Sequence, residues 1–202
     1  EISTRDWSSD VCSSDLASLV LGIGVGYFIG DSNASPSYDK VDVGFLQDMR
    51  YHHEQAIDMA FVYLTSTENT NPRLRLYAQE ILFTQQLEVG RMIELLRSFR
   101  QAEANDTGTA MGWMGMAMPI DQMEGLASQE DLDRLASASG DEASALFATL
   151  MIAHHRGGVS MAEYLVANGR NKDVRAMAQS MIKGQTSEIA EMEKVLGDLP
   201  SP

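Results

Sequence analysis

Cysteine is almost absent from this chain of 202 residues, which contains only Cys12. One thiol excludes an internal disulfide framework, a Cys-based zinc site and a Cys-x-x-Cys redox motif, so any soft metal ligand must be a thioether. Positive charge is also scarce, because 15 Lys and Arg stand against 29 Asp and Glu, a net charge of −14. An acidic chain repels the phosphate backbone, so we expect no nucleic-acid partner.

Histidine is rare and methionine is abundant. The four histidines form two adjacent pairs, His52-His53 and His154-His155, whereas methionine occurs 13 times. The hydrophobic content of 44% and the charged content of 22% are those of an ordinary globular chain that can build one sizeable core. No nucleophile elbow, phosphate loop or dinucleotide fingerprint is found. The sequence therefore gives little reason to expect a hydrolase or dehydrogenase, and it does not imply turnover.

The N-terminal residues differ in kind from the rest of the chain. Residues 5–16 back-translate naturally into a common sequencing adapter, and we therefore exclude residues 1–16 from the fold. If this exclusion is right, Cys12 is excluded too, and the remaining chain has no cysteine.

An apolar run follows at residues 17–30 and is shorter than the roughly 20 residues that a membrane-spanning helix needs. We interpret it as the remainder of a signal anchor or signal-peptide core, which predicts an extracytoplasmic protein that is membrane-anchored or secreted. Residues 31–37 are a polar linker to a domain at 38–198. Three glycines at four-residue spacing are compatible with helix pairing and hence with a homo-oligomer: Gly22, Gly26 and Gly30.

The domain contains an internal repeat. A shift of 102 residues and then one of 100 residues align identical residues of the two halves, which predicts a duplicated helical hairpin. The first shift places Phe45, Met49, His52, His53, Met59 and Ala60 on Phe147, Met151, His154, His155, Met161 and Ala162. The second places Asn71, Arg75, Ala78, Gln79, Gln85, Glu88, Met92 and Leu96 on Asn171, Arg175, Ala178, Gln179, Gln185, Glu188, Met192 and Leu196.

Each half supplies two segments in which inward residues recur at alternating steps of three and four, as on one face of an amphipathic helix. Four such segments predict an all-α fold, an antiparallel four-helix bundle made of two hairpins. We expect the turns at Asn71-Pro72 and at residues 168–171. A Met-rich connection at 105–127 precedes a capping box, Ser128 to Asp131, which opens a short helix that ends before Gly140.

Side chains that can coordinate a metal lie on the inward faces. Buried polar groups must be paired, hydrogen-bonded or bound to a metal. In both copies a methionine lies three residues before the first histidine and another lies seven residues after it, so thioether and imidazole share one face, which suits copper. The alternative is a structural His/Glu/Gln network that fixes helix register, with methionine as adaptable filler. The candidates on these faces are His52, His154, Glu88, Glu188, Gln85 and Gln185, flanked by Met49, Met59, Met92, Met151, Met161 and Met192.

His53 and His155 lie one step off the inward stripe. The sequence leaves them as metal ligands, as groups behind the ligands or as surface residues.

Iron is expected less than copper, as Cu(I) or Cu(II). Di-iron bundle enzymes use Glu-x-x-His on two helices, whereas this chain has Met49-x-x-His52 and Met151-x-x-His154. A thioether in the carboxylate position leaves only Glu88 and Glu188 as carboxylates on the stripes. A di-iron or copper oxidase is therefore the minor alternative.

The connection between the hairpins holds a second concentration of thioethers, which we treat as secondary metal candidates. Its glycines and Pro119 argue against a regular helix. Such a loop could pass Cu(I) to or from a metal donor or acceptor protein, cover the bundle, or form a contact surface. These residues are Met111, Met114, Met116, Met118 and Met123.

These motifs resemble the domain of unknown function 305 family over about residues 40–197. The residues that carry the resemblance are Asp42-x-x-Phe45-x-x-x-Met49-x-x-His52-His53-x-x-Ala56-x-x-Met59-Ala60, Met151-x-x-His154-His155-x-Gly157-x-x-x-Met161-Ala162 and the trailing Gln-x-x-Glu-x-x-x-Met elements. The resemblance implies a ferritin-like bundle in exported or membrane-anchored bacterial proteins, some of them linked to copper binding or tolerance.

The two copies depart from each other at two places. Ser144 stands where the first copy has Asp42, and Gly157-Gly158 replaces Gln55-Ala56, so the two halves need not be equivalent. Taken together, the sequence predicts an exported or membrane-anchored protein that binds or buffers copper. The alternatives are an interaction or scaffold module with a structural polar core, and the oxidase.

Overall fold

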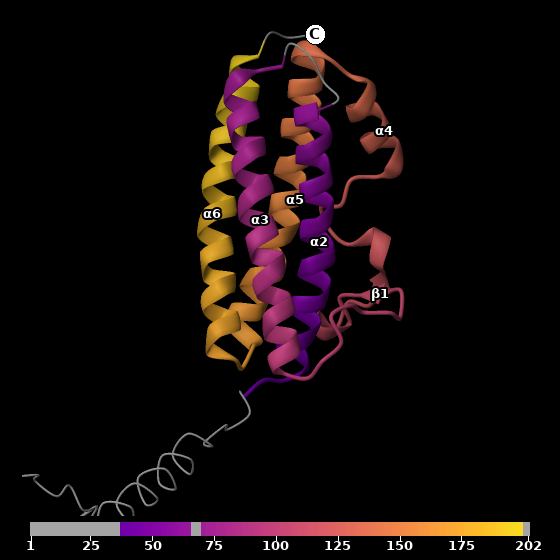
Figure 1. Ribbon diagram of the computed structural model, residues 1–202, viewed down its shortest axis with the longest axis vertical. Helices are drawn as coiled ribbons and strands as arrows, with labels where there is room; N and C mark the ends of the chain where they lie inside the picture. Colours follow the sequence, from indigo (N-terminus) through magenta and orange to yellow (C-terminus); the bar gives the residue numbers. More distant parts are fainter. Residues whose placement is uncertain (1–36, 66–69, 200–202) are drawn as a thin grey trace, which may run out of the picture. The chain divides into compact units, whose positions relative to one another are not determined.

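The computed structural model describes residues 37–65 and 70–199 (Figure 1). The predicted helical class is confirmed, because most of these residues are helical. No described helix is both long enough and apolar enough to cross a membrane. The predictions for residues 1–16 and 17–30 lie outside the described residues. The elements are α2 (Lys40–Thr65), α3 (Pro72–Ser98), β1 (Thr109–Ala110), η1 (Gly112–Met114), β2 (Met118–Pro119), η2 (Ile120–Gln122), α4 (Gln129–Ser137), α5 (Gly140–Asn168) and α6 (Lys172–Asp198).

The four long helices α2, α3, α5 and α6 lie side by side, and the segment between α3 and α5 runs along one side of them (Figure 1). Helix α2 packs against α3 and α5, and α6 packs against α5 and α3. The start of α2 shares a core cluster with the ends of α3 and α5 and the start of α6, so neighbouring helices run in opposite directions.

The apolar core consists of two clusters. The first cluster joins the start of α2 to the end of α5 and includes Phe45, Leu96 and Val174. The second joins the end of α2 to the start of α5 and includes Tyr63 and Phe147. On all four helices the residues between the two clusters include polar side chains, which places a polar layer halfway along the long helices.

Each hairpin turn is closed by an asparagine, as the sequence predicts. The side chain of Asn71 accepts hydrogen bonds from Arg73 N and Leu74 N at the start of α3. Asn171 does the same at the start of α6 with the amides of residues 173 and 174. An asparagine in this position satisfies helix N–H groups that have no partner within the helix.

Each turn is also tied to the opposite hairpin. Ser144 Oγ accepts from Asn71 N at 2.9 Å, and the Asp42 carboxylate accepts from Asn171 N at 3.1 Å. The carboxylate takes a further backbone hydrogen bond from Arg170 N. The departure at position 144 therefore keeps the contact with the opposite turn, although a hydroxyl that also donates to Gly140 O replaces the carboxylate.

The connection from α3 to α5 contains a small sheet that the all-α prediction missed. Strands β1 and β2 pair antiparallel. Each has only two residues, which is too short to show the alternating hydrophobic pattern that predicts a strand. Asp48 holds this part of the connection on α2, because its Oδ2 accepts from Met111 N at 2.7 Å and from Trp113 Nε1 at 2.8 Å. A Cβ on Gly44 would lie 2.5 Å from the Trp113 ring, so glycine makes room for the indole.

Helix α4 begins after Ser128, whose Oγ accepts from Asp131 N, as the capping box predicts.

Candidate metal centre

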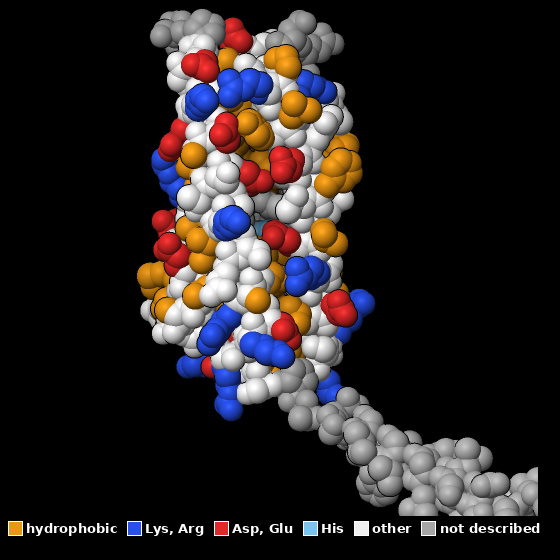
Figure 2. Space-filling model, turned by 90° about the vertical axis from the view of Figure 1, so that its left-hand side faces the viewer, with side chains coloured by type: hydrophobic (Ala, Val, Ile, Leu, Met, Phe, Trp, Pro, Cys, Tyr) orange, Lys and Arg blue, Asp and Glu red, His pale blue; other side chains and the backbone are white. Residues whose placement is uncertain are grey.

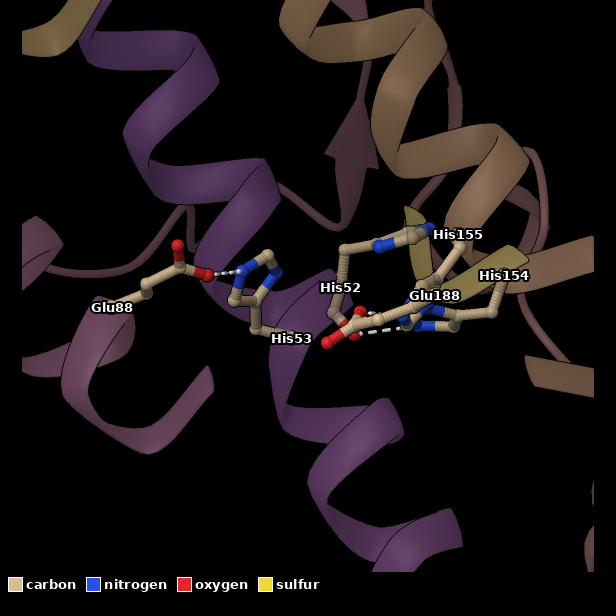
Figure 3. Close-up of polar contacts among 6 residues, drawn as sticks. All are labelled: His52, His53, Glu88, His154, His155 and Glu188. Carbon is tan, nitrogen blue, oxygen red and sulfur yellow. Dashed lines mark hydrogen bonds and ion pairs between the residues drawn. The ribbon is translucent and has the colours of Figure 1, made fainter. Parts of the chain in front are cut away.

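The polar layer receives two side chains from each long helix, and we call it the histidine layer. Its four imidazoles are at most 1% exposed, and its two amides are at most 5% exposed. Figure 3 shows the imidazoles with the two carboxylates. The members are His52 and His53 on α2, Gln85 and Glu88 on α3, His154 and His155 on α5, and Gln185 and Glu188 on α6.

The outer imidazoles form two matched pairs with carboxylates (Figure 3). His53 Nε2 lies 2.8 Å from Glu88 Oε2, and His155 Nε2 lies 2.7 Å from Glu188 Oε2. Both imidazoles are buried, so the interpretation of these histidines as surface residues is wrong. The same pair occurs once in each hairpin, which is what the repeat predicts.

The inner imidazoles face backbone carbonyls. His52 Nε2 lies 3.1 Å from Glu124 O, and His154 Nε2 lies 2.8 Å from His52 O. The two inner rings are close, with centroids 3.8 Å apart and planes inclined by 34°. The inner pair is therefore less symmetric than the outer pairs, because one of the two carbonyls belongs to the connection and the other to α2.

The hydrogen bonds assign a tautomer to each imidazole. In every case Nε2 faces a carbonyl or carboxylate oxygen, which can only accept, so Nε2 carries a proton, and Nδ1 is bare in the neutral form of each ring. All four Nδ1 atoms are buried without a hydrogen-bond partner. The Oε1 atoms of Gln85 and Gln185 are buried and unpartnered in the same way. Buried polar atoms are nearly always satisfied in folded proteins, by protein groups, ordered water or a bound ion, so these atoms are the candidates for binding a metal ion.

Burial keeps the inner imidazoles neutral. Burial lowers the pKa of His52 to about 3, and the neighbouring His53 contributes to the decrease. Burial and the adjacent His52 hold the pKa of His154 well below its usual value. Because desolvation disfavours the imidazolium form, both inner Nδ1 lone pairs are available to a metal ion at neutral pH.

Buried methionines lie on both sides of the layer. The predicted thioethers divide evenly: Met49, Met92 and Met161 belong to the first core cluster, and Met59, Met151 and Met192 belong to the second. Within residues 37–65 and 70–199, no three His, Cys, Asp or Glu side chains converge in the manner of a metal site. Imidazoles and carboxylates alone therefore do not make a complete ligand set in this part of the chain.

The methionines of the connection are dispersed. Met111 and Met123 belong to the first core cluster, and Met114 and Met118 pack partly against it. Met116 is 48% exposed. Two of these five predicted secondary candidates therefore contribute their side chains to the apolar core.

A short part of the connection covers the layer on one side, and we call residues 123–127 the strap. Besides the Glu124 carbonyl on His52, the strap is held by Gln55, whose amide donates to Ala127 O at 2.9 Å and accepts from Ala127 N at 2.7 Å. On α5 a Cβ at Gly157 would overlap the Glu124 carbonyl oxygen. Covering the bundle was one of the roles that the sequence left open for the connection, and the change from Gln55 to Gly157 between the copies marks where the strap lies.

The other side of the layer is hollowed between α3 and α6. The hollow has a volume of about 190 Å³. Figure 2 shows this face, with acidic side chains around a depression halfway along the helices. The sequence did not predict this hollow, because Thr84, Ser180 and Gly184 carry no metal-binding signal. The lining residues are Thr84, Gln85, Glu88, Ser180, Met181, Gly184, Gln185 and Glu188.

Several solved structures share this fold. A Streptomyces coelicolor protein described as a secreted DUF305 protein is 32% identical, with a TM-score of 0.72, and the match covers 78% of this chain and 93% of that one. A DUF305 fragment from Deinococcus radiodurans is 28% identical, with a TM-score of 0.69 and coverage of 81% and 100%. CopM in its Cu(II)-bound form is 28% identical, with a TM-score of 0.61 and coverage of 78% and 96%.

No protein of curated function matches the chain. The sequence profile of DUF305, a domain of unknown function, matches residues 42–196, which include both hairpins and the connection between them. The doubled histidine motif, the helical fold and this match agree, and the chain belongs to the DUF305 family.

Proposed function

We propose that this protein binds copper in the histidine layer and serves as a copper-binding or copper-buffering protein outside the cytoplasm. One observation carries the proposal: four buried Nδ1 atoms in one layer lack a hydrogen-bond partner. The lone pair of an unprotonated imidazole nitrogen can coordinate a transition metal. Burial of this nitrogen without any partner is energetically unfavourable.

The surroundings of the imidazoles fit metal ligands. Histidines that bind a metal commonly donate their second ring N–H to a carboxylate or a backbone carbonyl, which fixes the tautomer and the ring orientation. All four imidazoles have such an oxygen at Nε2. Glu88 and Glu188 then act through His53 and His155 as orienting groups. This role refines the expectation that the two carboxylates are themselves ligands.

The donor set favours copper over harder ions. Imidazole suits copper, and thioethers select Cu(I), whereas carboxylates and waters suit magnesium or calcium. Buried thioethers are present in both core clusters next to the layer. CopM, which shares the fold, has structures with Cu(II), Cu(I) and silver bound. These relatives support copper as the cargo, and the secreted relative from Streptomyces coelicolor supports a location outside the cytoplasm.

The two alternatives fit the layer less well. A purely structural network would be expected to use both nitrogens of each imidazole, yet every Nδ1 is left without a partner. A di-iron centre would need several carboxylate ligands, yet the layer has only Glu88 and Glu188, and each is engaged by a histidine.

A competition titration tests the proposal. Cu(I) is partitioned between the protein and a chromogenic chelator, with Cu(II), Zn(II) and Fe(II) in parallel, and every protein carries Cys12→Ser so that no thiol competes. We expect tight Cu(I) binding that is abolished in the variant with His52→Ala and His154→Ala. Retained stoichiometry in this variant, with helicity unchanged by circular dichroism, would contradict the site.

Matched methionine variants test the thioethers. Met49→Leu and Met161→Leu change buried methionines that flank the layer, whereas Met177→Leu changes a buried methionine of the same core cluster that is not in the histidine repeat motif. Leucine conserves volume, so stability changes little. We expect weaker Cu(I) binding in the first two variants and none of this effect in the third, with Cu(II) binding less affected throughout. Equal Cu(I) affinity in all three would remove the thioethers from the ligand set.

A further inference from the structure

The imidazoles of the layer are at most 1% exposed, so a metal ion cannot reach them from solvent without a route through the protein. The layer has a strap side and a hollow side, which differ in how they are closed. The strap crosses one side, and the hollow indents the other. The route can therefore be sought by comparing how firmly each side is closed.

The strap side is closed by contacts that leave no space. Gln55 binds both the amide and the carbonyl of Ala127, and the Glu124 carbonyl is bonded to His52. A Cβ on Gly125 would lie 2.7 Å from the Ala153 carbonyl oxygen, so the backbones of the strap and α5 touch. Opening this side would break these hydrogen bonds and separate two closely packed backbones.

The hollow side offers both space and ligands. Gln85 and Gln185 line the hollow, are at least 95% buried and leave their Oε1 atoms without a partner. Glu88 and Glu188 also line it, and each is hydrogen-bonded to a histidine of the layer. The hollow therefore reaches the carboxylates that contact the outer imidazoles, and its side-chain oxygens can replace the water molecules around a cation.

We propose that copper ions enter and leave the histidine layer through the hollow between α3 and α6, with Gln85, Gln185, Glu88 and Glu188 as a transient oxygen site on the way. The inference rests on the proposed copper-binding function and names the route to that site. Two carboxylates in a hollow raise the local concentration of cations. Amide and carboxylate oxygens hold Cu(I) weakly compared with imidazole and thioether, so the ion moves on to the softer ligands.

A pair of glycines provides a matched test. Gly184 on α6 lines the hollow, whereas Gly90 on α3 is absent from its lining, and a Cβ on either glycine would meet nothing within 4 Å. Gly184→Phe places a ring at the hollow, and Gly90→Phe makes the same change elsewhere on the surface. Both variants, in the full chain with Cys12→Ser, are loaded with Cu(I) and mixed with excess bicinchoninate, and release is followed by absorbance.

We expect Gly184→Phe to slow both uptake and release of Cu(I) about tenfold or more while the dissociation constant stays within threefold of the parent, because a blocked route changes rates and not the end states. Gly90→Phe is expected to exchange at the parental rate. Loosening the strap with Gln55→Ala is expected to leave the rates unchanged.

Parental exchange rates in Gly184→Phe would overturn the route, as would equal slowing in Gly90→Phe or faster exchange in Gln55→Ala. Weaker binding in Gly184→Phe without slower exchange would also overturn it. These outcomes differ from a failure of the proposed function, in which the parent itself would not hold Cu(I) against the chelator; that result would overturn the route as well.

Discussion

The two hairpins, residues 40–98 and 140–198, agree in the outer histidine–glutamate pairs of the layer and differ where the connection touches them. Their histidine–glutamate distances are 2.8 and 2.7 Å, and the asparagine caps of α3 and α6 use the same atoms. Gln55 on α2 binds the strap with a long side chain, whereas Gly157 on α5 meets it with none. The chain has one connection for two similar helices, so the equivalent positions cannot face the same surroundings.

This comparison separates two kinds of requirement. The outer histidine–glutamate pairs are the same in both hairpins and belong to the layer, whereas Gln55 and Gly157 differ between the hairpins and contact the strap. Gly157 illustrates the second kind, because a Cβ there would overlap the Glu124 carbonyl oxygen of the strap. Substitutions at equivalent positions should therefore have equal effects in the layer and unequal effects at the strap.

The largest inequality is expected at the strap. Gly157→Ala forces a methyl group against the Glu124 carbonyl, and overpacking of this kind costs about 3 kcal/mol of unfolding free energy. Gln55→Ala removes two hydrogen bonds at a half-buried position and is expected to cost about 1 kcal/mol. Urea unfolding measures both. Gly184→Ala is the control, since open space and better helix propensity make it neutral or stabilising. Equal losses of unfolding free energy in Gln55→Ala and Gly157→Ala would contradict the expected difference between the two hairpins at the strap.

Equal effects are expected in the layer. Glu88→Gln and Glu188→Gln keep an acceptor oxygen on each outer imidazole but remove the carboxylate, and loss of such a group weakens metal affinity about 10- to 100-fold. The chelator competition measures each variant. Effects that differ by more than about tenfold between the two variants would show that the hairpins contribute unequally to the site.

Like His154, whose pKa burial also lowers, His52 contributes to the pH dependence of stability. Its pKa is about 3 in the folded protein, and the ordinary value of 6.5 applies after unfolding. Between these values the unfolded chain binds more protons, so stability is fully present above pH 6.5 and is lost as the pH falls toward 3, by about 1.4 kcal/mol per pH unit at most.

Urea unfolding of the metal-free protein at several pH values measures this slope. His52→Asn should reduce it, because asparagine does not titrate in this range. The same slope in the variant and the parent would contradict the assignment of the loss to His52.

The smallest effect is expected at the ties between hairpins. Asp42→Ser gives the first hairpin the residue that the second has at Ser144, and it removes one acceptor from the Arg170 and Asn171 amides. We expect a loss of about 1 kcal/mol, the net value of a hydrogen bond, in urea unfolding. Ser144→Ala should lose a similar amount, because Asn71 N then lacks its acceptor. A much larger loss of unfolding free energy in either variant would indicate that the side chain does more than accept hydrogen bonds from the backbone amides of the turn.

Local features made the helices predictable. The spacing of residues such as Phe45, Met49 and His52 marks one helix face, and Asn71-Pro72 marks a helix start wherever it occurs. The repeat then placed His52, Gln85, Glu88 and their copies in one polar layer, but it left the roles of His53 and His155 open. These signals depend on neighbours within a few residues or on the duplication, and both are visible in the sequence.

The remaining features depend on contacts between distant segments. Nothing in the sequence distinguishes Asp48 from other helix residues, because its partner Trp113 lies in the distant connection. The tautomer of His52 depends on a carbonyl 72 residues away in the chain. The hollow arises where Thr84 and Gly184, from different hairpins, lie on either side of the same opening. No periodicity in the sequence encodes these contacts.

The central claim is that bare Nδ1 atoms of the four histidines bind copper, and ¹⁵N nuclear magnetic resonance of histidine-labelled protein tests it most directly. In the metal-free protein, the account predicts four imidazoles protonated at Nε2, with unprotonated Nδ1 resonances. On addition of diamagnetic Cu(I), Nδ1 resonances of the layer should shift while the Nε2–H signals persist. Protonated Nδ1 atoms in the metal-free protein, or Nδ1 resonances that do not move when Cu(I) is added, would contradict the account.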